Sequence, residues 1–260
     1  MRSILVHADR GPGMTARLET ALSLARETGG HVTVLVDTPV TRYVAMDPMG
    51  GSFIASEALK QALDDDDANA LKIEEKLRTE DVSFDVVRTE AEPVEALAKA
   101  ARLADVIVIS RSSGLAGELA LVSSTPVLAL ADNKPLAVPL SKACIAWDGG
   151  DEAAIALRSA VPLLAYCESV DVLTVLEKPG GFPGTQAMRY LSRHGIKAEL
   201  KELTRDGSTE ETLAKAIALA GSELLVMGAF GKSRMREFLF GGVTRYFLEQ
   251  DDGPALLMSH

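Results

Sequence analysis

The residues best suited to chemistry lie near the C-terminal end of the sequence, where glycines follow a short apolar segment. Residues 228–244 read GAFGKSRMREFLFGGVT, in which Gly228, Gly231 and Gly241 form the spacing G-x2-G-x9-G. Glycines let backbone amides approach a ligand because no Cβ stands in the way. The competing interpretation is that these glycines serve only tight turns and the packing of a helix on a sheet.

A helix is predicted to begin around Gly242, because Val243, Tyr246 and Phe247 give it one apolar face. The start of a helix offers unpaired N–H groups and a partial positive charge. The glycine-rich backbone and the helix start together predict a site for a phosphate group, to which Thr244 in the first turn can add a hydroxyl donor.

Gly231, Lys232 and Ser233 resemble the end of a P-loop, but Val226 stands where that motif needs its first glycine. We therefore do not predict a P-loop. Lys232 is expected either to help neutralise a phosphate or to lie exposed to solvent.

A second rival motif lies near the N-terminus. Residues 11–16 read GPGMTA, which has the outline of a dinucleotide-binding motif, and Asp37 follows 21 residues after its alanine. Against this interpretation, Asp9 and Arg10 separate the first glycine from the preceding strand, and Pro12 suits a helix start as a turn residue. A dinucleotide-dependent oxidoreductase therefore stays an alternative function.

The sequence shows few residues in arrangements that are typical of catalytic sites. The sequence has no G-x-S-x-G motif, its two cysteines fit no metal or redox spacing, and its four histidines are scattered without ligand spacing: Cys144 and Cys167, and His7, His31, His194 and His260. We expect no metal site and no enzyme activity beyond slow ATP hydrolysis.

The elements that must position the glycine loop occur twice along the chain. Residues 3–9 and 142–148 are apolar runs that end in Asp9 and Asp148, and each is followed by a helical stripe, all at an offset of 139 residues. Later segments match at other near-constant offsets: 31–37 with 171–177, 105–110 with 223–228, and 125–130 with 253–258. Such a series is what two diverged copies joined head to tail would leave.

Each copy is predicted to alternate short strands with helices, which favours an α/β fold with a parallel sheet and right-handed crossovers. The two copies join near residues 131–140, where two prolines and polar residues interrupt the pattern. The first copy carries an extra helical stretch within 41–80, including the acidic run Asp64 to Asp67, which we interpret as a solvated helix face because consecutive carboxylates point around a helix.

The composition and charge of the chain limit the kinds of binding partner that we expect. The chain has 260 residues, 47% hydrophobic and 25% charged, with a formal net charge of −10. An acidic chain gains little from the counterion release that drives nucleic-acid binding, so neither nucleic acid nor an anionic membrane is an expected partner. The apolar stretch at residues 4–8 is too short for a signal segment, and two cysteines are typical of a reducing compartment, so we expect a soluble, cytoplasmic protein.

Segment 228–244 and the strand that follows it resemble the universal stress protein family, whose ATP-binding members carry G-x2-G-x9-G-[ST] before the last strand. The order of strands and helices in both halves is also similar. The resemblance implies two tandem five-stranded parallel-sheet sandwiches of the adenine nucleotide alpha hydrolase-like type, each with strand order 3-2-1-4-5. It further implies that the two modules meet through their fifth strands, as a pseudo-dimer within one chain.

The same resemblance implies roles for individual residues. Asp148 would lie near the adenosine, and Val175 would contact the adenine. The loop around ribose and phosphates would comprise Gly228, Gly231, Gly241, Gly242, Val243 and Thr244. The sequence departs from the family at Gly242, where a Ser or Thr is usual, so a hydroxyl contact is lost while the amide remains.

We therefore expect a degenerate domain without a phosphate loop at residues 1–136 and a nucleotide-binding domain at 137–260. The first copy has only Gly114 and Gly117 where the loop should be. The expected ligand is ATP, with Mg²⁺ as a possible companion, in a stress-related regulatory protein that has an unidentified protein partner and could also form a homodimer. A nucleotide-independent interaction or chaperone-like module is the other alternative.

Overall fold

The computed structural model describes residues 1–46, 52–176, 182–231 and 242–260. In the first half the strands are β1 (Ser3–His7), β2 (His31–Asp37), β3 (Val44–Met46), β4 (Ser52–Ile54), β5 (Ser83–Thr89), β6 (Val106–Ser110) and β7 (Val127–Leu130). Its helices are α1 (Met14–Thr28), α2 (Ser56–Leu77), α3 (Pro93–Ala100) and α4 (Ala116–Val122), with 3₁₀ turns η1 (Val40–Tyr43), η2 (Ala101–Leu103) and η3 (Arg111–Ser113).

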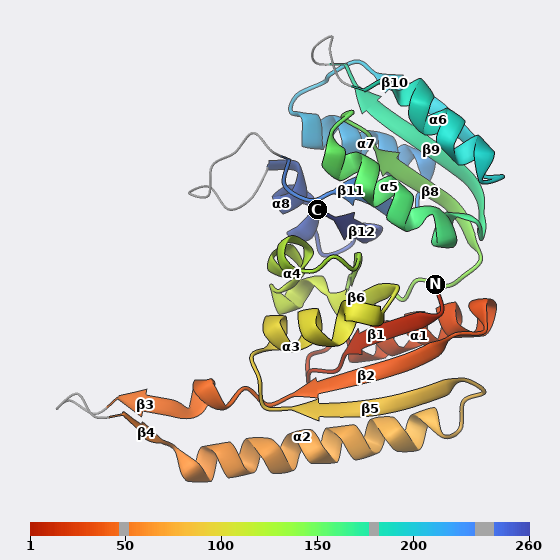
Figure 1. Cartoon of the computed structure of the whole chain (residues 1–260). Helices are drawn as coiled ribbons and strands as arrows, with labels where there is room; N and C mark the ends of the chain where they lie inside the picture. Colours follow the sequence, from red (N-terminus) through yellow and green to blue (C-terminus); the bar gives the residue numbers. More distant parts are fainter. Residues whose placement is uncertain (47–51, 177–181, 232–241) are drawn as a thin grey trace.

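The second half repeats this alternation (Figure 1). Its strands are β8 (Leu140–Ala146), β9 (Cys167–Val175), β10 (Ala198–Leu203), β11 (Leu224–Gly228) and β12 (Ala255–Ser259). Its helices are α5 (Asp151–Leu164), α6 (Gly184–Arg193), α7 (Thr209–Ala220) and α8 (Gly242–Leu248).

The two halves share one ten-stranded sheet of order β10-β9-β8-β11-β12-β7-β6-β1-β2-β5. The five strands that each half contributes to this sheet are parallel and follow the order 3-2-1-4-5, as expected. The halves meet where β7 and β12 pair antiparallel, with Leu128 opposite Leu257. The predicted contact through fifth strands is therefore confirmed, and the two sheets form one continuous mixed sheet.

Helices cover both faces of this sheet, and successive strand residues alternate between two cores. One core contains residues of α1, α2, α5 and α6, together with Val6 of β1. The other contains residues of α3, α4, α7 and α8, together with the neighbouring Leu5. This layering follows from right-handed crossovers, because connections that run in opposite directions along a parallel sheet lie on opposite faces.

Strand pairing corrects one match between the copies. Ile4 of β1 pairs with Val32 of β2, and the corresponding Ala143 of β8 pairs with Val170 of β9. The second strands therefore correspond at an offset of 138, and the sequence match of 31–37 with 171–177 was wrong by two residues. A shift of two keeps every side chain on the same face of the sheet, so hydrophobic periodicity could not reveal it.

The insertion in the first half also differs from expectation. A single long helix, the 22-residue α2, and the hairpin of β3 and β4 replace the predicted extra helical stretch. The acidic run is not a solvated face throughout, because Asp66 is 8% exposed and accepts a hydrogen bond from Thr38 Oγ1 at 2.7 Å. Asp65 and Asp66 form ion pairs with Arg10, which follows β1, and Asp67 forms one with Arg88 of β5. The acidic run therefore helps to hold α2 against the sheet.

A buried carboxylate in the second half predicts a pH dependence of stability. Asp171 of β9 is 1% exposed and accepts hydrogen bonds from Lys142 Nζ at 2.9 Å and Lys201 Nζ at 2.7 Å. Burial by itself would raise the pKa of Asp171, but the hydrogen bonds and charges of the two lysines outweigh it and lower that pKa. The stabilisation is therefore present above the unfolded pKa of about 4 and is lost as the pH falls through the folded value.

We expect Asp171→Asn to be less stable than the parent chain at pH 7 and to lose less of its remaining stability between pH 5 and pH 2. Urea unfolding at a series of pH values measures both effects. Parallel pH profiles for the two proteins would contradict this role of Asp171.

Candidate functional site

The candidate site lies at the carboxyl ends of β8 and β11, the two strands between which the chain order of the second half reverses. In open parallel sheets such a switch point leaves a crevice between connections that leave in opposite directions, and ligands bind there. Three predicted residues come to this edge: Asp148 follows β8, Val175 ends β9 and Gly228 ends β11. Lys232 and Gly241 lie outside the described residues.

Asp148 is exposed, and its Oδ1 accepts a hydrogen bond from the backbone N–H of Gly150 at 2.8 Å. This bond fixes the short turn that leads into α5, which begins at Asp151. A carboxylate held in this way keeps lone pairs free for hydroxyl or amino groups of a ligand. Val175 is half-buried beside it on the neighbouring strand and offers an apolar surface.

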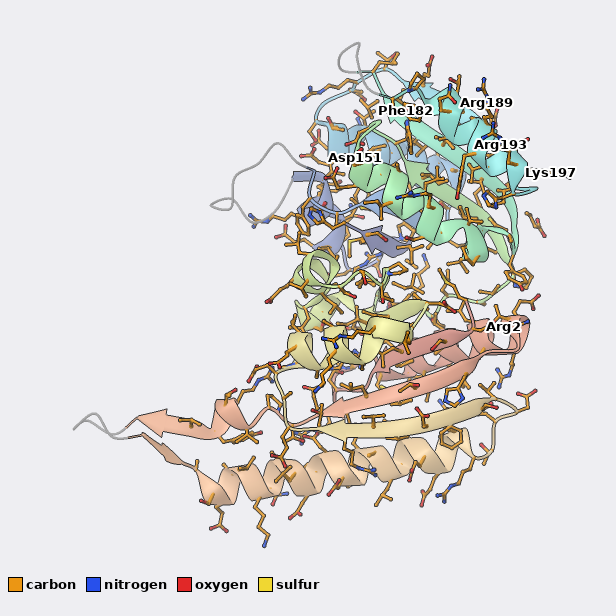
Figure 2. The ribbon with its side chains drawn as sticks, viewed as in Figure 1. Arg2, Asp151, Phe182, Arg189, Arg193 and Lys197 are labelled. Atoms are coloured by element: carbon orange, nitrogen blue, oxygen red, sulfur yellow. The ribbon has the colours of Figure 1, made fainter. Side chains whose placement is uncertain are left out.

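An aromatic pair that the sequence reasoning missed borders the same turn. Trp147, directly before Asp148, donates from Nε1 to the carbonyl oxygen of Phe182 at 2.9 Å, and the two ring centroids are 6.4 Å apart. Phe182 in turn donates its N–H to Gly149 O at 3.4 Å and is 58% exposed (Figure 2). The only signal in the sequence was that the chain has a single tryptophan, and it sits next to a candidate acidic residue.

The described glycines of the loop have different structural roles. A Cβ on Gly228 would lie 2.7 Å from the backbone nitrogen of Ala153 and 2.7 Å from the backbone carbon of Glu152, so β11 ends in close contact with the first turn of α5. Gly228 thus has a packing role. Gly231 has nothing within 4 Å of an added Cβ and is exposed.

This difference predicts a stability contrast between two glycine variants. Gly228→Ala should lower the free energy of unfolding by about 1–3 kcal/mol, because backbone atoms cannot move aside as a side chain would. Gly231→Ala is the matched control and should change it by less than about 0.5 kcal/mol. Urea denaturation measures both values, and equal stabilities would contradict the packing role.

The described part of α8 begins at Gly242, in agreement with the predicted helix start. Gly242 is exposed and Val243 is half-buried, whereas Thr244 is only 3% exposed. The hydroxyl of Thr244 therefore lies in the protein interior, and the exposed group at the start of α8 is the backbone of Gly242. The atom nearest to an added Cβ on Gly242 is Oε1 of Glu210, at 3.6 Å.

The equivalent corner of the first half is filled by side chains. Arg17 of α1 is completely buried between the ends of β1 and β6, where it donates to Ser110 Oγ at 2.9 Å and forms a short ion pair with Asp9. Burial alone would raise the pKa of Asp9, but the hydrogen bond and charge of Arg17 outweigh it and lower that pKa. A buried guanidinium thus occupies the switch point of this half.

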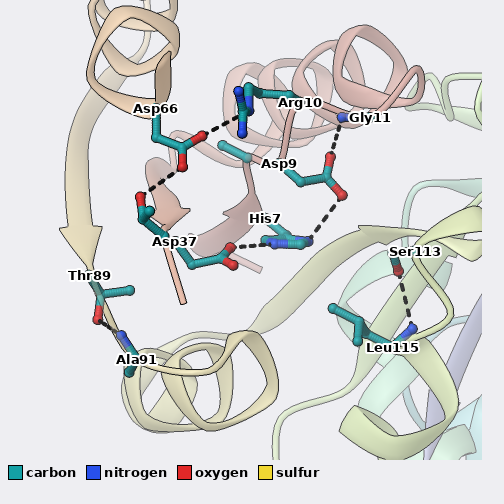
Figure 3. A network of polar contacts seen from close by, with 12 residues as sticks. His7, Asp9, Arg10, Gly11, Asp37, Asp66, Thr89, Ala91, Ser113 and Leu115 are labelled. Atoms are coloured by element: carbon teal, nitrogen blue, oxygen red, sulfur yellow. Dashed lines mark hydrogen bonds and ion pairs between the residues drawn. The ribbon is translucent and has the colours of Figure 1, made fainter. Parts of the chain in front are cut away.

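A histidine extends this network. His7 Nε2 lies 2.6 Å from Asp37 Oδ1, and His7 Nδ1 lies 3.7 Å from Asp9 Oδ2 (Figure 3). His7 is buried, so the ends of β1 and β2 are tied together by side-chain contacts. Asp9, the equivalent of Asp148, is thus held by Arg17 and His7, whereas no side-chain partner of Asp148 is found among the described residues.

The contacts in this corner also test whether the GPGMTA motif at residues 11–16 could bind a dinucleotide. A Cβ on Gly13 would lie 2.0 Å from Ser110 Oγ and 2.4 Å from Asp132 Oδ1, and the N–H of Gly11 already donates to Asp9 Oδ1 at 3.0 Å. A dinucleotide-binding loop needs its glycine backbone open to a pyrophosphate. Here the side chains of Ser110 and Asp132 cover Gly13. The lack of space and the negative charge of Asp132 both argue against a dinucleotide-dependent oxidoreductase.

Sheet register identifies the residues that differ between the two corners. Ile4 pairs with Val106 in the first half, and Ala143 pairs with Leu224 in the second, so the offsets of 139 and 118 residues hold in space. Arg17 then corresponds to Ala156, and Ser110 corresponds to Gly228. The second half has small residues where the first half has the side chains that fill its corner.

Comparison with known proteins identifies the class of protein. The sequence profile of the universal stress protein family matches residues 1–138 and 140–257, and the chain therefore belongs to the universal stress protein family, with two such domains in tandem. No curated protein shows a significant match to the sequence.

Two of the following three solved structures agree with this fold over the whole chain. A universal stress protein from Archaeoglobus fulgidus DSM 4304 is 13% identical, with a TM-score of 0.74, and the match covers 99% of this chain and 96% of that one. A candidate universal stress protein from Pseudomonas aeruginosa UCBPP-PA14 is 18% identical, with a TM-score of 0.57 and coverage of 100% and 93%. An Arabidopsis thaliana family protein, solved with AMP bound, is 11% identical, with a TM-score of 0.34 and coverage of 46% and 90%.

No helix within the described ranges is both long and apolar enough to cross a membrane.

Proposed function

We propose that this protein is a regulatory member of its family that binds an adenine nucleotide, preferably ATP, at the switch point of its second domain. The observation that carries the proposal is the contrast between the two corners. Arg17 and Ser110 fill the first, whereas Ala156 and Gly228 stand at those positions in the second and Asp148 is exposed.

The chemistry of this corner suits a nucleoside. The carboxylate of Asp148 can accept hydrogen bonds from ribose hydroxyls or an exocyclic amino group. Val175, which packs against the core that contains residues of α7 and α8, offers apolar surface for a flat base. Phosphates would extend toward the exposed backbone at Gly231 and Gly242.

Mg²⁺ would be held mainly by the phosphates. The described residues include no group of three histidine, cysteine or acidic side chains that could bind a metal, although Glu210 beside Gly242 could add one carboxylate oxygen. Nor do we assign a nucleophile and base, so the proposed role is binding, through which nucleotide occupancy alters a surface that a partner protein contacts.

Isothermal titration with ATP tests this proposal. Asp148→Asn should weaken binding about tenfold, the usual effect of removing a charged hydrogen-bond acceptor. The matched control is Glu168→Gln, which removes the same charge from an exposed residue near the start of β9, at the opposite end of the strands. Equal affinities for Asp148→Asn and the parent chain would contradict the assignment of Asp148.

A second variant tests the loop itself. Gly241→Val should abolish ATP binding and leave the circular dichroism spectrum unchanged, because a branched side chain in the glycine loop blocks the approach of a phosphate. Mass spectrometry of the denatured, purified protein completes the test. Released ATP or ADP supports the proposal, NAD(P) or flavin supports a dinucleotide enzyme, and the absence of ligand and of titration heat supports a nucleotide-independent module.

A further inference from the structure

A second concave site lies where the two domains meet. A cavity of about 430 Å³ is lined by η3 and the start of α4 from the first domain and by the last turns of α8 from the second. The lining residues within the described ranges are Arg111, Gly114, Ala116, Gly117, Arg245, Leu248 and Glu249. Three of these are glycine or alanine, which leave space, and a volume of this size is typical of a small-molecule site.

Arg111 gives this cavity an unusual charge. Arg111 is 8% exposed, and burial lowers the pKa of its guanidinium to about 10. The described residues include no carboxylate paired with it, and no nearby charge contributes to the shift in its pKa. Buried charges are normally paired, because removing an ion from water costs several kcal/mol unless an opposite charge compensates.

The guanidinium is held in place by backbone. Arg111 NH1 donates to Gln250 O at 2.8 Å, and NH2 donates to Pro254 O in a short hydrogen bond. These two bonds use two of the five N–H donors, and Nε is buried without a partner among the described residues. The carbonyl groups orient the cation across the domain boundary, but they carry no net charge to balance it.

The other two charged residues of the described lining form an ion pair with each other. Arg245 Nε of α8 lies 2.7 Å from Oε1 of Glu249, the residue that follows this helix, and both side chains are largely exposed. The described residues of the cavity lining therefore have a net charge of +1, in a chain whose overall charge is −10. A fixed, desolvated arginine in a preformed concave site is the usual device for binding carboxylate or phosphate.

From these observations we infer that the cavity between the domains binds a small oxyanion, a phosphate or a carboxylate, with Arg111 as its counter-charge. This site is separate from the proposed nucleotide site, because it uses the last turns of α8 and residues of the first domain. An anion bound here bridges the two domains, since Arg111 belongs to one and Arg245 to the other.

Titration of the full chain with sodium phosphate, and separately with sodium acetate, tests this inference against sodium chloride at matched ionic strength. We expect saturable phosphate or acetate binding by calorimetry and a matching rise in the thermal midpoint. The arm that saturates at the lower concentration identifies the preferred group. Arg111→Gln should weaken this binding at least about tenfold.

Two further variants keep the test decisive if Arg111→Gln fails to fold. Glu249→Gln removes the only acidic side chain of the described lining and should tighten binding several-fold, whereas Arg245→Gln should weaken it. Arg193→Gln, on the exposed face of α6 far from this cavity, changes the net charge equally and should have no effect (Figure 2). Absence of saturable binding, or equal affinities in Glu249→Gln and Arg245→Gln, would overturn the inference.

Discussion

Replacing Arg17 by methionine is expected to destabilise the first domain by about 3 kcal/mol, because it leaves a partly buried carboxylate without its partner. Arg17 is fully buried, and its guanidinium contacts include Asp9, Ser110 and the sulfur of Met14. The side chain of Asp9 is 31% exposed, which places the cost at the low end of the range for broken buried pairs. Methionine keeps most of the side-chain volume, so the loss reflects the charge rather than a cavity.

The reverse variant, Asp9→Ala, should cost more, because it leaves a guanidinium in the core without the one ion-pair partner that it has among the described residues. The double variant Asp9→Ala/Arg17→Met should then be more stable than the sum of the single effects predicts, with a coupling of about 2 kcal/mol. Urea unfolding of the four proteins completes the cycle. Additive effects would show that Arg17 and Asp9 do not act as a pair.

Most of the fold could be predicted from the internal repeat of the sequence. Once residues 3–9 and 142–148 were recognised as equivalent, the alternation of strands and helices implied two parallel units, and the resemblance supplied the strand order and the meeting of fifth strands. Hydrophobic periodicity is reliable for such features because buried strands and helices need it everywhere along their length. The two-residue error at β9 shows its limit, since periodicity fixes which face a residue occupies but not the register along the strand.

The interior polar contacts could not be predicted in the same way. No feature of the sequence assigned a role to Arg17, and the run of four acidic residues that contains Asp66 was interpreted as a solvated helix face. Both are buried because partners from distant segments reach them, Ser110 for Arg17 and Thr38 for Asp66. Only tertiary structure brings such pairs together.

Glycine spacing was informative about the position of the candidate site but not about the role of each glycine. Asp148, Val175 and Gly228 do come to one edge of the sheet, since carboxyl ends of parallel strands share that edge. Yet Gly228 is required by the backbone of α5, and Thr244 is buried. A glycine needed for packing and a glycine needed for a ligand look identical in sequence.

Residues 140–260, produced alone, are expected to form a homodimer through β12. This strand occupies the middle of the sheet, where Leu256, Leu257 and Met258 are fully buried and pair antiparallel with β7. Removing the first domain exposes an apolar edge strand, which readily pairs with another chain. In the intact chain Leu257 lies opposite Leu128, so a second copy of β12 centred on Leu257 offers the same residue type at the same place.

Light scattering coupled to size exclusion measures this association. The isolated domain should elute with twice its chain mass, and Leu257→Lys should return it to a monomer or prevent folding, because a charge cannot be buried at that position without a partner. Leu219→Lys is the control, since Leu219 on α7 is 90% exposed and should leave the dimer intact. A folded monomer of residues 140–260 would mean that the pairing of β7 with β12 depends on contacts specific to the first domain. Foremost among these is Arg111, which reaches Gln250 and Pro254 across the boundary.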